Sequence, residues 1–463
     1  MEEKQWVVKI NNELNSLANT SEESAHWSKR FIYKIPACVT ELNKRAYKPQ
    51  IVSIGPYHHG MGDLRAMEEH KHRALLHFLK RSNKPLNTFV EALAPVLQDL
   101  KDAYDQLDPK WHLKENDDEF LEMMILDGCF ILEILRTTDS ATHTHHSTQT
   151  HDQTTSSNAT NHSEDYASND PIFSTHGKLY IVPYLKRDML MLENQIPMLV
   201  LEKLVFVQNA NVVKKGKELM KRILNFFSQA ISVKNIHEIE KCFHILDVYR
   251  KSLLSEEPRS KKHTKTKSGQ NSIIHRGGGD EIIRSATELN EAGIRIRTSK
   301  TRSLKDISFH GGVLELPLIV VDDALESLYL NLIAFERFHV GAGNEVTSYI
   351  FFMDNIIDNS RDVSLLHSCG VIQNALGSDK AVANLFNSLS KDITLDPESR
   401  LDDVQKRVSS YCQKPWHRWR ANLMHTYFTN PWAILSVIAA IFLFALTILQ
   451  TVYSVLSYVS PAS

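Results

Sequence analysis

The sequence has little net charge, few glycines and prolines, and no dense set of cysteines. Its 53 Lys and Arg residues are balanced by 55 Asp and Glu residues, and the formal charge of −2 argues against a dedicated binder of nucleic acid or another polyanion. Only 17 Gly and 15 Pro occur among 463 residues, which excludes a collagen-like or linker-like chain. The apolar fraction of 42% excludes wholesale disorder, and the length is ample for a folded core.

The cysteines are few and widely spaced. The five are Cys38, Cys129, Cys242, Cys369 and Cys412. They form no CxxC pair, and no spacing of Cys and His matches a zinc site. An odd and scattered set is typical of free thiols in a reducing compartment, whereas a secreted disulfide domain has a denser, even set. We therefore predict no metal site and no disulfide framework.

Familiar catalytic motifs are also missing. The sequence contains no GxGxxG, GxxxxGK[ST], HExxH or GxSxG pattern and no EF-hand loop. The pair of glycines at Gly341 and Gly343 lacks the third glycine and the preceding strand of a nucleotide-binding loop. We predict no cofactor. The absence of these motifs argues against an enzyme but leaves an unfamiliar one open.

The N-terminus does not look like a secretory signal. It carries acidic residues early and contains no long apolar run. Its apolar residues recur instead at the helical spacings of three and four: Trp6, Val7, Ile10, Leu14 and Leu17. We assign residues 1–26 to an N-terminal helix or tail.

A long apolar run occupies the C-terminal part of the chain. Residues 432–453 are 22 residues without a charge, and a helix of that length spans about 33 Å. A hydrocarbon core of about 30 Å can be crossed by such a helix, so we predict a transmembrane segment. Trp432 and Tyr453 are placed to anchor its ends at the two membrane interfaces. Residues 454–463 form a short tail in this assignment.

Basic residues flank this run on one side only. They are Lys406, Arg407, Lys414, Arg418 and Arg420, and no Lys or Arg follows them. The positive-inside rule predicts a cytoplasmic location for the large N-terminal part, as in a tail-anchored protein of the plasma membrane or an endomembrane. The opposite orientation would expose the glycosylation sequons at Asn19, Asn158 and Asn161.

Two polar segments interrupt the rest of the chain. In residues 137–170, Thr, Ser and His supply 20 of 34 residues and no Leu, Ile, Val, Phe or Met occurs, which predicts a disordered insertion. Residues 255–280 form a second insertion that is basic. Across residues 259–305, 12 Lys or Arg stand against four acids, which fits either a solvated loop or contact with an anionic membrane surface. No aromatic residue is interleaved with these bases, which argues against nucleic-acid binding.

Most of the remaining sequence has helical periodicity. Helices are predicted over residues 64–81, 89–107, 120–135, 187–207, 324–336, 346–358, 362–376 and 380–389. The helix over 187–207 is expected to break near Pro197. Residues 292–321 instead hold short apolar runs between Gly and Ser, which predicts two or three strands. The predicted fold class is therefore mainly α with a small β-sheet element: a helical globular body plus one C-terminal transmembrane helix.

Several blocks of residues resemble a known plant family. They are Ile32-Tyr33-Lys34-Ile35-Pro36, Tyr47-Lys48-Pro49, Val52 through Gly60, Met67-Glu68 with Lys71, Asp127 through Phe130, Asp188, Leu192 through Pro197, Ala292-Gly293-Ile294, Asn331 through Glu336, and Asn430-Pro431-Trp432. In this order they resemble the family called domain of unknown function 247. The resemblance implies a plant membrane protein with a helical family domain over residues 27–425, one C-terminal membrane helix and no established catalytic activity.

The signature blocks supply the candidates for ligand or partner contact. These are Tyr57, His58, His59, Glu68, Lys71, Glu193, Asn194 and Gln195. Adjacent histidines on an extended chain point to opposite sides, so His58 and His59 are not expected to share a metal. Glu68 and Lys71 lie three residues apart on a predicted helix and fit a surface ion pair. Residues 193–195 interrupt an apolar stretch, and we expect them to cap or hold a neighbouring segment because buried polar groups need partners.

Three functional hypotheses remain open. The first is a membrane-anchored plant protein that binds a protein partner in signalling or recognition. The second is an uncharacterised enzyme whose pocket uses His58, His59, Glu68 or residues 193–195. The third is an electrostatic membrane-contact protein that uses the basic residues 259–305. Candidate side chains that converge in one pocket would favour the enzyme, whereas side chains that satisfy backbone groups would argue against it.

Overall fold

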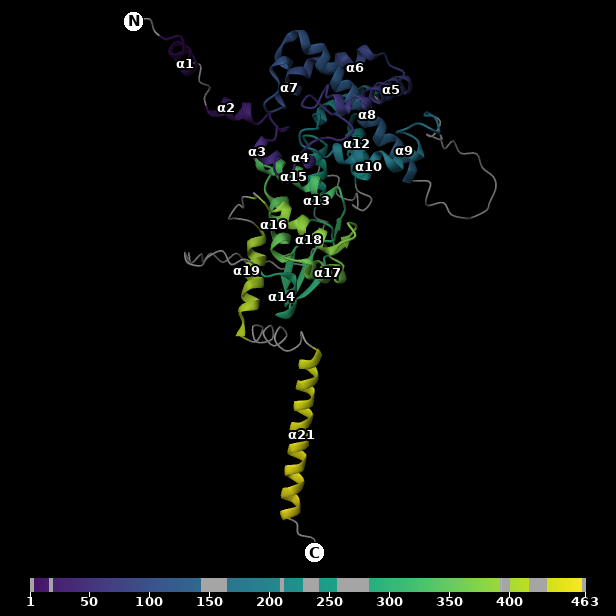
Figure 1. The fold of residues 1–463 in the computed structure, drawn as a ribbon. Coiled ribbons are helices and arrows are strands. Elements are labelled where there is room, and N and C mark those ends of the chain that lie inside the picture. Colours follow the sequence, from purple (N-terminus) through teal and green to yellow (C-terminus); the bar gives the residue numbers. More distant parts are fainter. Residues whose placement is uncertain are drawn as a thin grey trace, which may run out of the picture. The chain divides into compact units, whose positions relative to one another are not determined.

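The structure is a computed structural model of the chain, drawn in Figure 1. It describes residues 4–15, 20–142, 165–208, 212–227, 241–255, 283–391, 393, 400–415 and 431–459. These residues are mainly helical with a few short strands, as the sequence predicts. The chain divides into two compact units where the sequence suggested one helical body. Unit 1 comprises residues 1–262, 301–305 and 322–347, and unit 2 comprises residues 263–300, 306–321 and 348–463.

Unit 1 is built around the long helix α8 (Asp117–Thr142). The helix begins with three acidic residues, which suit the positive end of the helix dipole. Almost every side chain from Phe120 to Leu135 is buried, so α8 has no broad solvent face and forms the centre of the core. The helices α5 (Ala66–Ser82), α6 (Leu86–Leu93), α11 (Met198–Gln208) and α12 (Val212–Phe227) pack against it.

Shorter helices complete unit 1. They are α1 (Gln5–Asn15), α2 (Thr20–Trp27), α3 (Ala37–Thr40), α4 (Lys44–Tyr47), α7 (Leu97–Asp102), α9 (Thr175–Tyr180), α10 (Val182–Asp188), α13 (Ile245–Leu254) and α15 (Leu325–Phe338), with the 3₁₀ turns η1 (Gly62–Leu64), η2 (Ala94–Val96), η3 (Pro109–His112) and η4 (Lys114–Asn116). α16 (Glu345–Ile356) begins in unit 1 and ends in unit 2. Two stretches of unit 1 have no regular structure although they are largely buried: residues 48–61 and residues 189–197. These two stretches carry most of the candidate site residues.

Unit 2 combines short helices with two small sheets. In the first sheet, β1 (Arg295–Thr298) pairs in parallel with β3 (Val313–Leu316), and β2 (Ser308–His310) pairs antiparallel with the other side of β3. In the second, β4 (Ile319–Val321) pairs in parallel with β5 (Ile372–Asn374). Among the described residues, the helices of this unit are α14 (Ala286–Glu291), α17 (Ser360–Ser368), α18 (Asp379–Leu389), α19 (Arg400–Gln413) and α21 (Pro431–Val459), together with most of α16.

The predicted β element is present, and one predicted helix next to it is too long. Residues 292–321 carry four strands, β1 to β4, where two or three were expected. The helix predicted over residues 362–376 ends at Ser368. Gly370 follows with a positive φ of 74°, a conformation that commonly ends a helix. The apolar residues after it then form β5 against β4, so the second half of this prediction is wrong.

The helix predicted over residues 187–207 is broken, as expected, but over a longer stretch. α10 ends at Asp188 and α11 begins at Met198, directly after Pro197. Residues 189–197 between them form turns and irregular structure. Polar side chains in this stretch bind backbone groups of other segments, so the local sequence serves tertiary contacts instead of a continuous helix.

The two predicted insertions lie mostly outside the described residues. α8 continues through Thr142, so the first six residues of the segment 137–170 are helical. Within this part of the helix, the Thr137 hydroxyl donates to the Glu133 carbonyl at 2.9 Å, so this polar group is satisfied by its own helix. Residues 165–170 are also described. The disorder predicted for residues 143–164, and for residues 256–280 of the basic insertion, lies outside the described residues.

The C-terminal helix α21 (Pro431–Val459) contains the apolar run. Its segment Leu435–Leu456 has a mean hydropathy of 2.4, and none of it is buried against other parts of the chain. Such a helix is long and apolar enough to cross a membrane. Thr447 donates its hydroxyl to the Leu443 carbonyl at 2.8 Å, so this polar residue does not interrupt the apolar surface. Tyr453 is exposed, whereas the side chain of Trp432 lies outside what the structure describes.

Candidate functional site

One buried carboxylate holds the irregular segment that follows α4. Asp188, the last residue of α10, is fully buried. Its Oδ2 accepts three consecutive backbone N–H groups, those of Gln50 (2.9 Å), Ile51 (2.8 Å) and Val52 (3.2 Å). Buried backbone donors that lack a helix or sheet partner need another acceptor, and this side chain supplies it. Asp188 lay in the family blocks but was not among the predicted site residues.

Asn194 also binds the backbone of the irregular segment 48–61, just beyond the residues that Asp188 holds. Its side-chain oxygen accepts the N–H of Ile54 at 2.7 Å. Its side-chain nitrogen donates to the carbonyls of Val52 at 3.1 Å and Asp188 at 3.0 Å. Asn194 is fully buried and uses both ends of its amide, so it replaces the pairing that a neighbouring strand would give.

Glu193 and Gln195, on either side of Asn194, bind other segments. Glu193 Oε1 accepts the N–H of Ile35 at 2.6 Å. Gln195 donates to two carbonyls of its own turn at 2.7 Å each and accepts the N–H of Leu246 at 3.2 Å. The expectation that residues 193–195 hold neighbouring segments is therefore confirmed. Three polar side chains in a row tie three separate parts of unit 1 together.

Lys71 is the buried centre of a charged group. Its Nζ lies 2.6 Å from Asp127 Oδ1 on α8, 2.8 Å from Glu68 Oε1 on its own helix α5, and 3.3 Å from Ser53 Oγ. Only 1% of its side chain is exposed, so the surface ion pair expected for Glu68 and Lys71 is wrong in its location. Burial alone would lower the pKa of Lys71, but Asp127 and Glu68 outweigh burial and raise it. Lys71 is therefore positively charged in the core.

The second carboxylate oxygen of Asp127 binds the backbone of the irregular segment 48–61. Asp127 Oδ2 accepts the N–H of Gly55 at 2.7 Å. Gly55 has a φ of +75°, and a Cβ there would lie 2.5 Å from the Gln195 carbonyl oxygen. Both facts require glycine at this position. The polar interruption that Asp127 makes in the apolar helix was visible in the sequence, but its two partners were not.

Tyr57, His58 and His59 leave this segment in different directions. The Tyr57 hydroxyl donates to the backbone carbonyls of Ile32 (3.1 Å) and Asp105. His58 Nε2 lies 3.4 Å from Glu193 Oε2 inside unit 1. His59 instead lies 3.8 Å from Glu119, and its ring meets the edge of Trp111. The two histidines share no partner, as their adjacent positions predicted.

Burial shifts the protonation of these groups toward their neutral forms. The pKa of His58 is lowered to about 4 by burial, and the cations Lys34 and Lys48 lower it further. Burial raises the pKa of Glu193, against the effect of its bond from the Ile35 N–H. The pKa of Tyr57 is raised, first by burial and then by Asp105. At neutral pH the ring of His58 is therefore neutral, and its contact with Glu193 is not a strong ion pair.

Two residues that were not among the predicted site residues also bind backbone groups of other segments. Asn331 on α15 accepts the Leu192 N–H at 2.8 Å and donates to the Ala46 carbonyl at 2.9 Å. Glu336, on the same helix, binds Arg250 at 2.6 Å and accepts the N–H groups that begin α16. Both lie in the Asn331–Glu336 block that carried the family resemblance. Their position in an otherwise apolar helix was the available signal.

His244 is a further buried histidine, and its tautomer follows from its partners. It precedes α13, and its Nδ1 accepts the Asp247 N–H at 3.2 Å while its Nε2 faces the Phe31 carbonyl at 3.1 Å. Only a neutral ring with the proton on Nε2 satisfies both contacts. Burial lowers the pKa of His244 to about 4, although Asp247 and the Phe31 carbonyl act in the opposite direction.

The chemistry available to this group of residues is structural. Nearly all of the predicted site side chains bind backbone groups or buried partners within unit 1. Among the residues that the structure describes, no three His, Cys, Asp or Glu side chains are placed to hold a metal. Because most of these side chains satisfy backbone groups or buried partners and do not converge in one pocket, they argue against a His/Glu catalytic pocket.

The fold and the site together define a class of protein. It has a mainly helical body, polar signature residues that tie irregular segments of the core, and a C-terminal helix able to cross a membrane. A family model described as a plant protein of unknown function, DUF247, matches residues 32–446. The chain belongs to this family. The resemblance inferred from the sequence blocks is thereby confirmed.

Two relatives from Arabidopsis thaliana match along most of their length. The chain is 31% identical to UPF0481 protein At3g47200 over 460 residues, which cover 95% of this chain and 89% of the relative. It is 22% identical to putative UPF0481 protein At3g02645 over 543 residues, which cover 97% of this chain and 94% of the relative. No solved structure matches the chain.

The buried charge at Lys71 leads to a stability prediction. We expect Asp127→Ala to lower the free energy of unfolding by about 3–5 kcal/mol, because it leaves a buried ammonium short of a partner and the Gly55 N–H without an acceptor. Asp63→Ala is the matched control, since Asp63 pairs with Lys48 at 3.0 Å on the surface. Its cost should stay below about 1 kcal/mol. Urea titrations of the full chain in detergent, followed by circular dichroism, compare the two. Equal losses of unfolding free energy in the two variants would show that the buried Asp127–Lys71 pair stabilises the fold no more than a surface pair does.

The depressed pKa of His244 leads to a pH prediction. The unfolded state, with a His pKa of about 6.5, binds more protons than the folded state between pH 6.5 and 4. Stability should therefore fall as the pH drops through this window, with up to about 1.4 kcal/mol per pH unit from His244.

His244→Asn should reduce that slope, because Asn can still cap α13 but does not titrate. The exposed His72 provides the control, and His72→Asn should leave the slope unchanged. Unfolding titrations at several pH values between 4 and 7.5 measure the slopes. A slope in His244→Asn equal to that of the wild type would contradict the assignment of a neutral buried ring.

Proposed function

We propose that this chain is a membrane-anchored plant protein that acts by binding a protein partner, in signalling or recognition. The observation that carries the proposal is α21. Its apolar segment Leu435–Leu456 makes no buried contact with the described parts of the chain, and exposing such a surface to water is unfavourable. Insertion into a bilayer removes that surface from water and keeps all backbone groups of the helix paired.

The body of the chain lies on the cytoplasmic side in this proposal. Basic residues at 406, 407, 414, 418 and 420 precede α21, and none follows it. This asymmetry retains the flanking segment in the cytoplasm. The scattered free thiols, such as exposed Cys38 and buried Cys129, fit a reducing compartment. Whether the membrane is the plasma membrane or an endomembrane stays open in the proposal.

An exposed patch on α9 and α10 supports a partner-binding role. Leu179, Tyr180 and Tyr184 are 64%, 57% and 51% exposed, and the two helices pack against each other. Exposed tyrosines are typical of the anchor residues of protein interfaces. The buried signature residues cannot serve this purpose, because they are engaged within unit 1.

The two alternative hypotheses have less support. The enzyme hypothesis rested on a pocket that used His58, His59, Glu68 or residues 193–195, and Glu68 and residues 193–195 instead bind internal partners. The membrane-contact hypothesis rests on residues 259–305, of which 259–282 lie outside the described residues. One described base of this region, Lys305, pairs with Glu345 at 3.2 Å. This hypothesis stays a prediction.

Membrane anchoring can be tested by two charges on α21. Phe442→Lys combined with Leu446→Lys should release the protein from membranes, because each Lys near the middle of a span costs roughly 2.5–3.5 kcal/mol. The control places two lysines on exposed leucines of the body, Leu42→Lys and Leu113→Lys. Alkaline carbonate extraction should leave wild type and control in the pellet and the α21 variant in the supernatant. Retention of the α21 variant would contradict a membrane span.

The orientation has its own readout in the same membranes. Protease added to sealed vesicles should degrade the body, and the sequons at Asn19, Asn158 and Asn161 should remain unglycosylated. A protected body with a glycosidase-sensitive mass shift would reverse the proposed topology.

The exposed patch supplies a test of partner binding. Tyr180→Ser with Tyr184→Ser should reduce the yield of specific cross-linked partners from plant membranes by about tenfold or more, as expected for interface anchors. Leu42→Ser with Leu113→Ser removes a similar exposed apolar area elsewhere and should have no effect. Quantitative cross-linking with mass spectrometry compares the variants. Equal recovery of the same partners by all three proteins would exclude this patch as the interface.

A further inference from the structure

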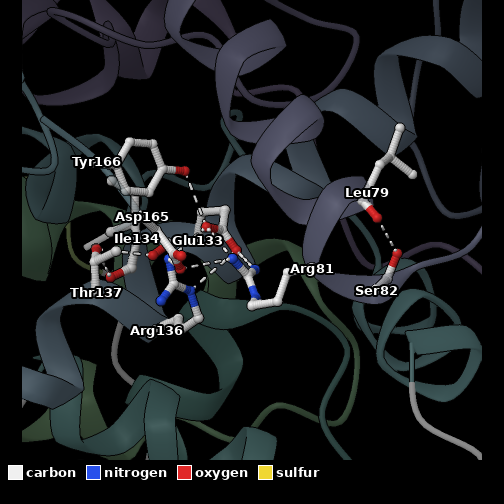
Figure 2. Close-up of polar contacts among 9 residues, drawn as sticks. All are labelled: Leu79, Arg81, Ser82, Glu133, Ile134, Arg136, Thr137, Asp165 and Tyr166. Atoms are coloured by element: carbon white, nitrogen blue, oxygen red, sulfur yellow. Dashed lines mark hydrogen bonds and ion pairs between the residues drawn. The ribbon is translucent and has the colours of Figure 1, made fainter. Parts of the chain in front are cut away.

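Figure 2 shows a buried carboxylate held between two arginines. Glu133 of α8 is fully buried. Arg81 of α5 binds both of its oxygens, and Arg136, one turn further along α8, donates to Oε2 at 3.0 Å. The hydroxyl of Tyr166 donates to the same oxygen at 3.0 Å. The hydrogen-bonding capacity of Glu133 is therefore satisfied within this cluster.

A cavity of about 100 Å³ lies beside the cluster, between α5, α8, α11 and α12. Its apolar wall is formed by Phe78, Leu132, Leu135, Val205 and Leu219. A water needs roughly 10–15 Å³ of such space, so the cavity accommodates on the order of ten non-hydrogen atoms. An apolar wall with a small number of polar groups is typical of small-molecule sites.

The charged groups at this cavity favour a ligand with one negative charge. Three arginines line it, Arg81, Arg136 and Arg222, against two glutamates, Glu133 and Glu218. Arg222 and Glu218 lie 3.5 Å apart and offset each other. Two guanidinium groups then share the single carboxylate of Glu133. The lining keeps one net positive charge at the end where Arg81 and Arg136 meet.

A carboxylate of the chain itself lies against these two arginines. Asp165 is not part of the cavity lining, but its Oδ2 is 3.2 Å from Arg136 and 3.5 Å from Arg81. Its side chain is 41% exposed. Both arginines are less exposed than Asp165, so water and a competing carboxylate reach these ion pairs from the aspartate side, where solvent weakens them. Asp165 thus shows that Arg81 and Arg136, which line the cavity, can bind a second carboxylate besides that of Glu133.

We propose that this cavity binds a small organic monocarboxylate with an apolar, aromatic body. The body lies among Phe78, Val205 and Leu219, and the carboxylate takes the place of Asp165 on Arg81 and Arg136. Planar guanidinium groups match a carboxylate well, whereas a phosphate dianion would bring more negative charge than the lining offsets. The inference goes beyond the proposed anchoring and partner binding and does not depend on either.

The direct test is a titration of the full-length protein in nanodiscs by calorimetry. The probe is phenylacetate, whose size matches the cavity. Phenylacetamide is the matched neutral control because it has the same shape and no charge. We expect phenylacetate to bind at least about tenfold more tightly than phenylacetamide, and acetate or inorganic phosphate to bind at least about tenfold more weakly than phenylacetate.

Two substitutions leave the buried Glu133 cluster intact. Asp165→Asn should tighten phenylacetate binding several-fold, because it removes the competing carboxylate. Val205→Phe should weaken it at least about tenfold, because the larger ring fills the cavity. The controls are Asp99→Asn and Val340→Phe, which change exposed residues on other elements of the same unit and should leave binding unchanged. Circular dichroism verifies that every variant is folded.

Several results would overturn the proposal. One is the absence of phenylacetate binding up to about 10 mM, a concentration that corresponds to a negligible affinity for a ligand of this size. Others are equal binding of phenylacetate and phenylacetamide, or unchanged binding in folded Val205→Phe. Binding of acetate or phosphate as tight as that of phenylacetate would show an anion site without an apolar subsite. Unchanged affinity in Asp165→Asn would refute the displacement of Asp165.

Discussion

Buried backbone without regular structure is the constraint on which unit 1 depends. Residues 48–61 and 189–197 pass through the core as turns and irregular segments, so their N–H and C=O groups have no helix or sheet to pair with. An unpaired buried group costs about 1–3 kcal/mol, and several in a row would exceed the stability of an ordinary domain. Asp188, Asn194 and Asp127 remove this cost by binding the backbone with their side chains. The signature residues are therefore explained by hydrogen bonding before any function is considered.

The use of buried carboxylates brings a second constraint, because each negative charge in the core must be compensated. The structure compensates the charges of Asp188 and Asp127 in different ways. Asp188 is stabilised by three N–H groups and by Arg187, whose guanidinium lies 3.6 Å away. Asp127 receives one N–H and therefore needs a full counter-charge, which Lys71 supplies from the adjacent helix. A buried ion pair rarely adds net stability compared with apolar residues of similar size. We infer that the pair instead fixes one arrangement, because a shift of the Gly55 turn would leave a charge unpaired in the core.

These contacts also show what could be predicted from the sequence and what could not. The apolar periodicity of α8 and the uncharged run of α21 identified both helices, because each pattern depends only on neighbouring residues. The spacing of three residues between Glu68 and Lys71 is also a local pattern, and it predicted an ion pair on the surface. Lys71 is buried because Asp127 lies opposite it, and no local pattern carries that information. Residues 193–195 were identified as ties, since three polar residues in an apolar stretch need partners, but the partner segments at Ile35, Ile54 and Leu246 were not predictable.

The prediction of one short strand failed for a related reason. β5 has three residues, and its partner β4 lies far away in the sequence, so the local pattern around β5 is too short to indicate a strand. The helical periodicity before Gly370 therefore extended too far. In contrast, the strands of residues 292–321 lie close together in the sequence and were identified as a group. Prediction succeeded where the stabilising contacts are local and failed where a distant partner decides the structure.

The internal role of the signature residues changes how functional experiments on them must be interpreted. A substitution of Glu193 or Asn194 removes a contact that holds irregular backbone, so a loss of partner binding in such a variant follows from local unfolding as readily as from a lost interface. Residues that have no such internal role are better probes. Tyr180 and Tyr184 are exposed, and Val205 lies at the wall of a cavity, so substitutions there leave the hydrogen bonds that hold the core backbone in place. Experiments on the proposed recognition are therefore best directed at surfaces and cavities outside the buried signature residues.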